Sequence, residues 1–117
     1  MAEARHAVRA FLARQGLRPD HRTSQDAQLV VSELVTNAIR HAPGPGELVV
    51  ELEPAAGHLV IAVRDTSPSP PAPHEGDPAR PGGHGLRLVA RLCSQVWTVP
   101  APPGKRVVAL LDLRGNG

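Results

Sequence analysis

The chain has 117 residues and a mass of 12.4 kDa, which suits one domain with a single core and leaves no room for two. Its formal charge of +2 is scattered, with no run of basic residues, and only Phe11 and Trp97 are aromatic. These features argue against a protein that stacks single-stranded nucleic acid on aromatic rings or binds DNA directly through a concentrated basic face.

Cysteine content and apolar runs favour a soluble, cytoplasmic protein. Cys93 is the single cysteine, so no disulfide can form within the chain and a reducing compartment is expected. The longest apolar runs, such as residues 59–63, have five residues, far fewer than a membrane-spanning helix needs. Helical periodicity begins directly after the first residues, so we expect neither a secretory signal nor a membrane segment.

Two helices are predicted in the first part of the chain. Residues 3–15 place apolar side chains on one face, and Gly16 stands where a helix C-cap is expected. A second helix is predicted to begin after Thr23 or Ser24, where the T-x-x-D pattern resembles a capping box, and to end before the Pro-Gly-Pro-Gly run at residues 43–46. Its apolar positions recur three or four residues apart, as expected for one buried face: Ala27, Val30, Val31, Leu34, Val35, Ala38 and Ala42.

A hairpin and a long loop are predicted next. Residues 47–53 and 59–65 alternate apolar and polar side chains on either side of a short turn, which indicates an antiparallel hairpin. Residues 66–84 contain six prolines and three glycines and have no apolar periodicity. A loop of this length is uncommon in so small a domain, so we expect a lid over a functional site.

The last part of the chain completes one α/β domain over residues 1–117. A third helix is predicted from about Gly85 to Arg91, followed by strands at residues 96–99 and 107–113 around a turn at 101–104. Trp97 and Cys93 are expected to be buried. The order of elements predicts a two-layer sandwich, with three helices on one face of a mixed, mainly antiparallel sheet of about four strands.

A polar stripe runs along the second predicted helix. Glu33, Asn37 and His41 lie at i, i+4 and i+8, so they follow one margin of the apolar face. Side chains at such a margin can face a cleft beside the core, although a solvated helix edge has the same pattern. The stripe gains meaning only together with other residues.

Asp65 ends a strand whose other inward residues are apolar. A carboxylate there can accept a hydrogen bond from the exocyclic amine of adenine, whereas guanine would present a second acceptor. A strand-terminal aspartate can also simply open a turn. Further along, Gly82-Gly83-His84-Gly85-Leu86 stands before the third helix, where glycines and unpaired helix N–H groups allow a close approach of phosphate.

Taken in order, these segments resemble the motifs of the GHKL ATPase superfamily, which includes histidine kinases, gyrase-type topoisomerases and mismatch-repair ATPases. The segments are ELVTNA at residues 33–38, VRD at 63–65 and GGHGL at 82–86. The wording SELVTNAIRHA and the proline-rich loop ending in GGHGL are most similar to small actinobacterial ATP-binding regulators of the anti-sigma-factor serine kinase type. The resemblance covers nearly the whole chain and implies a Bergerat-type fold.

The resemblance implies a role for each matching residue. Asn37 would ligate Mg²⁺, Glu33 would act as the catalytic base, and Asp65 would read the adenine amine. His41 would face the phosphates, or lie on the surface as an ordinary helix residue. The phosphate oxygens of ATP would be held where the loop meets the third helix, at Gly83, Gly85 and Leu86.

Three features depart from the superfamily pattern. The usual D-x-G-x-G segment reads Asp65-Thr66-Ser67-Pro68-Ser69, so its glycines are missing. Gly104-Lys105 is followed by Arg106 where a threonine is usual. Many relatives have a strand before the first helix, whereas this sequence begins at the helix.

The function implied is a regulatory serine/threonine protein kinase that phosphorylates a small anti-sigma-factor antagonist and sequesters a sigma factor. Its cofactors would be ATP and Mg²⁺, and a homodimer is an option. An alternative is a module that binds ATP without transferring phosphate and controls a protein partner. A third is a degenerate scaffold that binds no nucleotide.

Overall fold

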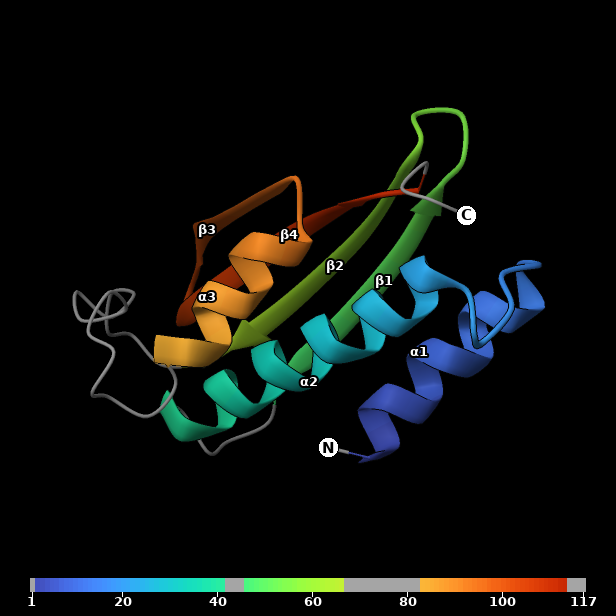
Figure 1. The fold of residues 1–117 in the computed structure, drawn as a ribbon. Helices are drawn as coiled ribbons and strands as arrows, with labels where there is room; N and C mark the ends of the chain where they lie inside the picture. Colours follow the sequence, from blue (N-terminus) through green and yellow to red (C-terminus); the bar gives the residue numbers. More distant parts are fainter. Residues whose placement is uncertain (1, 42–45, 67–82, 114–117) are drawn as a thin grey trace.

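A computed structural model describes residues 2–41, 46–66 and 83–113 of the chain. Three helices lie on one face of a four-stranded sheet, and no helix of the described residues covers the opposite face (Figure 1). The elements follow one another as α1 (Ala2–Arg14), α2 (Arg22–His41), β1 (Glu47–Glu53), β2 (His58–Asp65), α3 (Gly83–Leu92), β3 (Gln95–Ala101) and β4 (Gly104–Asp112). This is the two-layer α/β sandwich that the sequence predicts.

The end of α1 follows the predicted glycine C-cap. Gly16 has a φ of +92°, a backbone conformation that side chains with a Cβ rarely adopt. The N–H of Leu17 donates to the carbonyl of Leu12 at 2.9 Å, and the N–H of Gly16 donates to the carbonyl of Ala13 at 3.0 Å. These bonds satisfy carbonyls at the end of α1 and turn the chain toward α2.

The start of α2 differs from the predicted capping box. The helix begins at Arg22, and the N–H of Thr23 donates to Nδ1 of His21 at 3.0 Å. His21 therefore caps the helix with its imidazole, at the position where a serine or aspartate is more usual. Thr23 and Ser24 lie inside the first turn instead, and both are buried. The helix therefore begins two or three residues before the predicted start, which followed Thr23 or Ser24.

The sheet has the strand order β1-β2-β4-β3, and all three strand pairs are antiparallel. The mixed sheet expected from the sequence is thus antiparallel throughout the described residues. β2 lies between β1 and β4, so its last residue, Asp65, is beside Lys105 of β4. The predicted strand at residues 107–113 begins three residues earlier, at Gly104, and the turn is confined to Pro102 and Pro103.

The core lies between the helices and the inner face of the sheet. The inner face of β2 and β4 carries Leu59, Ile61, Ala109 and Leu111, which pack against one face of α1 and α2. Trp97 pairs across the strands with Val108, which alternates with these inner residues, so both face the side of the sheet that has no helix. Trp97 is 41% exposed, and the expectation that it belongs to the core is wrong.

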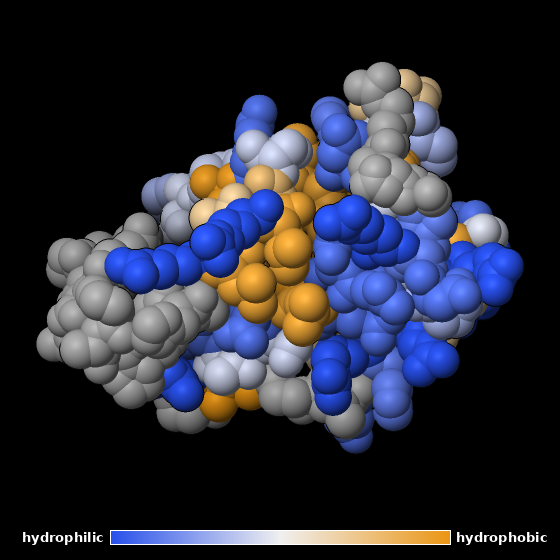
Figure 2. Space-filling model, viewed as in Figure 1, coloured by the Kyte–Doolittle hydropathy of each residue, from blue (hydrophilic) through white to orange (hydrophobic). Residues whose placement is uncertain are grey.

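α3 begins at Gly83, two residues before the predicted start and inside the predicted lid of residues 66–84. Thr66 follows β2 without regular structure, and the rest of the predicted lid, residues 67–82, lies outside the described residues. α3 packs against α2, and the space-filling view from the helix side shows apolar side chains gathered over α2 and α3, bordered by hydrophilic ones over α1 (Figure 2).

Candidate functional site

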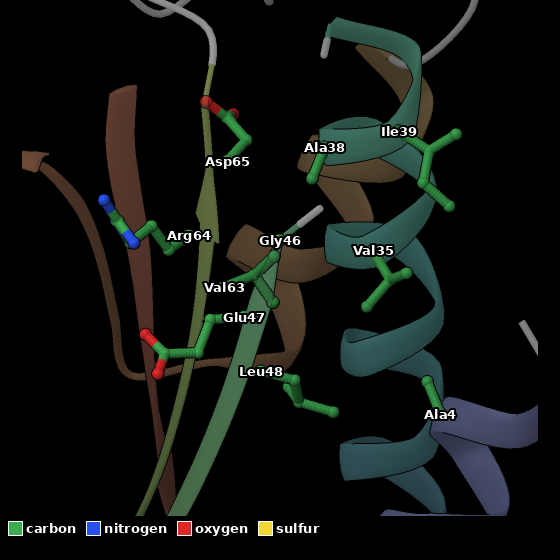
Figure 3. Close-up of a pocket in the computed structure, with 10 residues that line it drawn as sticks. All are labelled: Ala4, Val35, Ala38, Ile39, Gly46, Glu47, Leu48, Val63, Arg64 and Asp65. Carbon is green, nitrogen blue, oxygen red and sulfur yellow. The ribbon is translucent and has the colours of Figure 1, made fainter. Parts of the chain in front are cut away.

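A pocket of about 310 Å³ opens between α2 and the edge of the sheet (Figure 3). Val35, Ala38 and Ile39 of α2 form one wall, and the opposite wall comes from the ends of β1 and β2. Figure 3 shows that Leu48 and Val63 point toward α2. The lining is predominantly apolar, as in pockets that take flat organic ligands. The lining residues are Ala4, Val35, Ala38, Ile39, Gly46, Glu47, Leu48, Val63, Arg64 and Asp65.

Asp65 is the buried acid of this pocket. It ends β2 on the same face as Val63 and Ile61, because alternate residues of a strand share a face. Only 4% of its surface is exposed. The sequence predicts an inward carboxylate at this point, and the structure has one.

Lys105 lies beside Asp65 and was not among the predicted site residues. Its Nζ is 2.9 Å from Oδ2 of Asp65, and 6% of the lysine is exposed. The two residues are direct partners in the β2–β4 register. One sequence signal could have found this lysine. It precedes Val107, Ala109 and Leu111 at intervals of two, so a strand that includes it must turn it inward.

Two glycines let the neighbouring strands approach the end of β2. A Cβ on Gly104 would collide with the backbone carbonyl of Asp65 and would lie 2.7 Å from the Cα of Thr66. A Cβ on Gly46 would lie 2.7 Å from the carbonyl oxygen of Arg64. Both contacts are closer than real Cβ atoms tolerate, so Gly46 and Gly104 are needed for the close packing that surrounds Asp65.

Glu33 and Asn37 are half-buried on a different flank of α2. Neither lines the pocket described above. Asp26 lies seven residues before Glu33 and eleven before Asn37, which places the three on one side of the helix. Asp26 borders a second, more polar hollow together with Cys93, just after α3. The flank that carries Glu33 and Asn37 therefore faces α3.

The remaining predicted site residues lie at the ends of two helices. His41 is the last residue of α2, and its side chain is outside the described part of the structure. Gly83, Gly85 and Leu86 form the first turn of α3, although the side chain of Leu86 is also outside that part. The first four N–H groups of a helix have no partner within it, so this turn has the chemistry of an anion site.

Cys93 is partly buried, whereas the sequence predicts a buried side chain at this position. Burial, and secondly the negative charge of Asp26, raise the pKa of Cys93 from 9.0 to about 12. A thiol with so high a pKa stays protonated at neutral pH and is a poor nucleophile.

The part of the chain that the structure describes has no metal site made of protein side chains alone. No group of three or more His, Cys, Asp or Glu side chains among the described residues could hold a metal ion. Mg²⁺ commonly binds through one or two protein oxygens, water and the phosphates of a nucleotide. The amide oxygen of Asn37 fits that mode as a single protein ligand.

The fold and the pocket define an α/β sandwich of the GHKL class, with a buried aspartate between the long helix and the sheet. A family profile described as a histidine kinase-like ATPase domain matches residues 1–110. Because this match spans nearly the whole chain, the protein belongs to the histidine kinase-like ATPase domain family.

Solved structures of histidine kinases share the fold. The catalytic domain of histidine kinase ThkA superposes with a TM-score of 0.57 at 17% identity, over 76% of this chain and 66% of that chain. The blue-light activated histidine kinase EL346 of Erythrobacter litoralis gives a TM-score of 0.58 at 24% identity, over 79% of this chain and 45% of the other. AdeS of Acinetobacter baumannii gives 0.57 at 15% identity, over 79% and 48%.

These comparisons establish the fold and the family. The chain spans between 45% and 66% of the length of these three structures, and no curated protein matches it. Among the described residues, no helix is both long enough and apolar enough to cross a membrane.

Proposed function

We propose that this domain binds Mg²⁺-ATP and acts as a serine/threonine protein kinase of the anti-sigma-factor type, with a small antagonist protein as its substrate and a sigma factor as its sequestered target. The observation that carries nucleotide binding is Asp65, a nearly fully buried carboxylate on the wall of an apolar pocket between α2 and the sheet. The kinase chemistry rests on Glu33 and Asn37 and on the resemblance described above.

The apolar pocket supports the proposal that the adenine base binds between α2 and the sheet. Apolar walls from Val35, Ala38 and Val63 suit the faces of a purine ring, and a buried carboxylate suits its amine. An ionised carboxylate only accepts hydrogen bonds, so Asp65 can pair with the amine of a 6-amino purine and opposes the oxygen of a 6-oxo purine.

The flank of α2 that faces α3 supports the proposal that the phosphates of ATP bind between these two helices. Asn37 lies on that flank, and the first turn of α3 offers backbone N–H groups from Gly83 and Gly85. ATP supplies the transferred phosphoryl group, and Mg²⁺ neutralises charge on its oxygens. Asn37 would hold the metal through its amide oxygen.

Glu33 is the candidate base for phosphoryl transfer. It lies one helical turn before Asn37 on the same flank and is half-buried. A carboxylate there can accept the proton of a serine hydroxyl from a partner protein as that oxygen attacks phosphorus.

The test of this function is label transfer from γ-labelled ATP to small antagonist proteins that carry an acceptor serine, with binding of ATP followed by calorimetry. We expect the Glu33→Gln variant to bind ATP as the wild type does and to transfer no label. Glu3→Gln, on the exposed part of α1, is the matched control and should transfer label normally. If the wild type binds no ATP in the presence of Mg²⁺, the proposal is wrong.

A second candidate is a module that binds ATP without transferring phosphate and sequesters a partner in a nucleotide-dependent way. The observation that favours it is the segment after Asp65, where Thr66 and Ser67 are followed by proline in place of the usual glycines. Tight ATP binding without label transfer to any antagonist would decide for this module and against the kinase.

A further inference from the structure

Lys105 and Asp65 form an ion pair at the end of β2 in which both charged side chains are buried. The two side chains are 7% and 5% exposed, and their charged atoms are 2.9 Å apart. Removing two charges from water has a large desolvation cost, which a buried pair often fails to recover relative to an apolar pair of similar size. Stability alone therefore does not account for a lysine at this position.

The position of Lys105 in the sheet ties it to the candidate base-reading acid. β4 lies next to β2, and Lys105 is the direct register partner of Asp65, on the face that carries Val107 and Ala109 against the helices. Gly104 has no side chain, so β4 packs against the backbone of Asp65 closely enough for the two side chains to lie in contact. Lys105 does not line the pocket, whereas Asp65 does.

The geometry points to Lys105 as a specificity-determining positioning residue: its ammonium pairs with the Asp65 carboxylate and holds it in place as a hydrogen-bond acceptor, so that the site selects a purine with a 6-amino group. This inference rests on the proposed nucleotide function. Lys105 acts through Asp65 and has no contact of its own with the base.

The selectivity follows from the two protonation states of a carboxyl group. An ionised carboxylate only accepts hydrogen bonds, so it pairs with the amine of adenine and opposes the 6-oxo group of hypoxanthine. A protonated carboxyl also donates one, so it can pair with either base. The ammonium of Lys105 pairs with the form that only accepts hydrogen bonds, and a neutral side chain at this position removes that pairing.

The experiment compares the dissociation constants of ATP and inosine triphosphate, which differ at the 6-position of the purine. For the wild-type chain with Mg²⁺, we expect ATP to bind at least about tenfold more tightly than inosine triphosphate. In Lys105→Met, the affinity for ATP should fall and the preference should shrink to about threefold or less. A purely structural lysine would weaken both nucleotides equally and leave the ratio unchanged.

Three further variants complete the design. Lys105→Arg keeps the positive charge and should restore the preference for ATP. Lys105→Gln keeps an N–H donor toward Asp65 without the charge, and it provides the same comparison if the methionine variant does not fold. Arg106→Met removes a charge from the next residue of β4, which faces the other side of the sheet, and should leave the preference intact.

Each outcome decides the question. A reduced preference in Lys105→Gln or Lys105→Met, restored in Lys105→Arg, supports the inference. An unchanged preference in folded neutral variants, as judged by circular dichroism and thermal unfolding, overturns it. Failure of the wild type to bind either nucleotide would instead refute the proposed function, and equal binding of both by the wild type would refute base selection through Asp65.

Discussion

Gly104 lies against the backbone carbonyl of Asp65 so closely that no Cβ can stand between them. This contact joins the start of β4 to the end of β2 at the point where the candidate base-reading acid enters the pocket. The packing of β2 against β4 and the placement of Asp65 therefore both depend on a glycine at position 104.

We expect Gly104→Ala to lower the free energy of unfolding by about 1–3 kcal/mol, because the added carbon must push the two strands apart. Binding of ATP should weaken as well, since the displaced backbone carries Asp65. Gly16→Ala is the control. Its added carbon meets nothing within 4 Å, although the positive φ makes the variant strained. Urea denaturation and calorimetry measure both effects. Weaker ATP binding in both variants would contradict the local explanation.

The wall of the pocket formed by α2 provides a second prediction. In Ala38→Trp, the large side chain should fill the pocket and weaken ATP binding at least about tenfold, because it takes the space of the base. Circular dichroism should show that the helices remain. Ala10→Trp makes the same change on the exposed side of α1 and should bind ATP normally. Unchanged binding in Ala38→Trp would exclude this pocket as the place of the base.

Asn37 should matter only when the metal is present. Loss of even an outer partner of a metal typically costs about 10- to 100-fold in affinity, so Asn37→Ala should reduce ATP affinity at least about tenfold with Mg²⁺. With a chelator in place of Mg²⁺, the variant and the wild type should bind equally. Gln28→Ala removes an amide from the opposite flank of α2, where Gln28 donates to Ser24, and serves as the control. An equal loss with and without Mg²⁺ would argue against a metal ligand.

The raised pKa of Cys93 leads us to expect that the folded chain loses stability in alkaline solution. Its pKa of about 12 in the folded chain exceeds the ordinary value of 9.0, so the unfolded chain loses this proton first. The contribution of the neutral thiol to stability is therefore complete below pH 9 and declines as pH rises toward 12. Denaturation between pH 8 and 10.5 should show a steeper decline for the wild type than for Cys93→Ala. Parallel declines would mean that the thiol is not involved.

The elements that local patterns describe well could be predicted from the sequence. The apolar spacing of α2 around Leu34 and the glycine that ends α1 each reflect interactions within a few residues of chain, and both are confirmed. The inward turn of Asp65 also follows from alternation along one strand. The family resemblance then connected these local features into a fold, which the structure and the family match support.

Other features depend on contacts between distant residues, which no local pattern contains. The pairing of Lys105 with Asp65 requires the register between two strands that are separated by α3 and β3. Trp97 was expected to be buried because it is large and apolar, but β3 alternates in the direction that turns it away from the helices. His21 was not predicted as a cap because imidazole rarely has that role.

The outward position of Trp97 has a practical consequence for spectroscopy. It is the only tryptophan of the chain, and it lies on the face of the sheet opposite the helices and the pocket. Its emission therefore senses the solvent at the back of the molecule. We expect the emission of Trp97 to change little in a nucleotide titration. A protein that covered this face of the sheet would shift the emission to the blue.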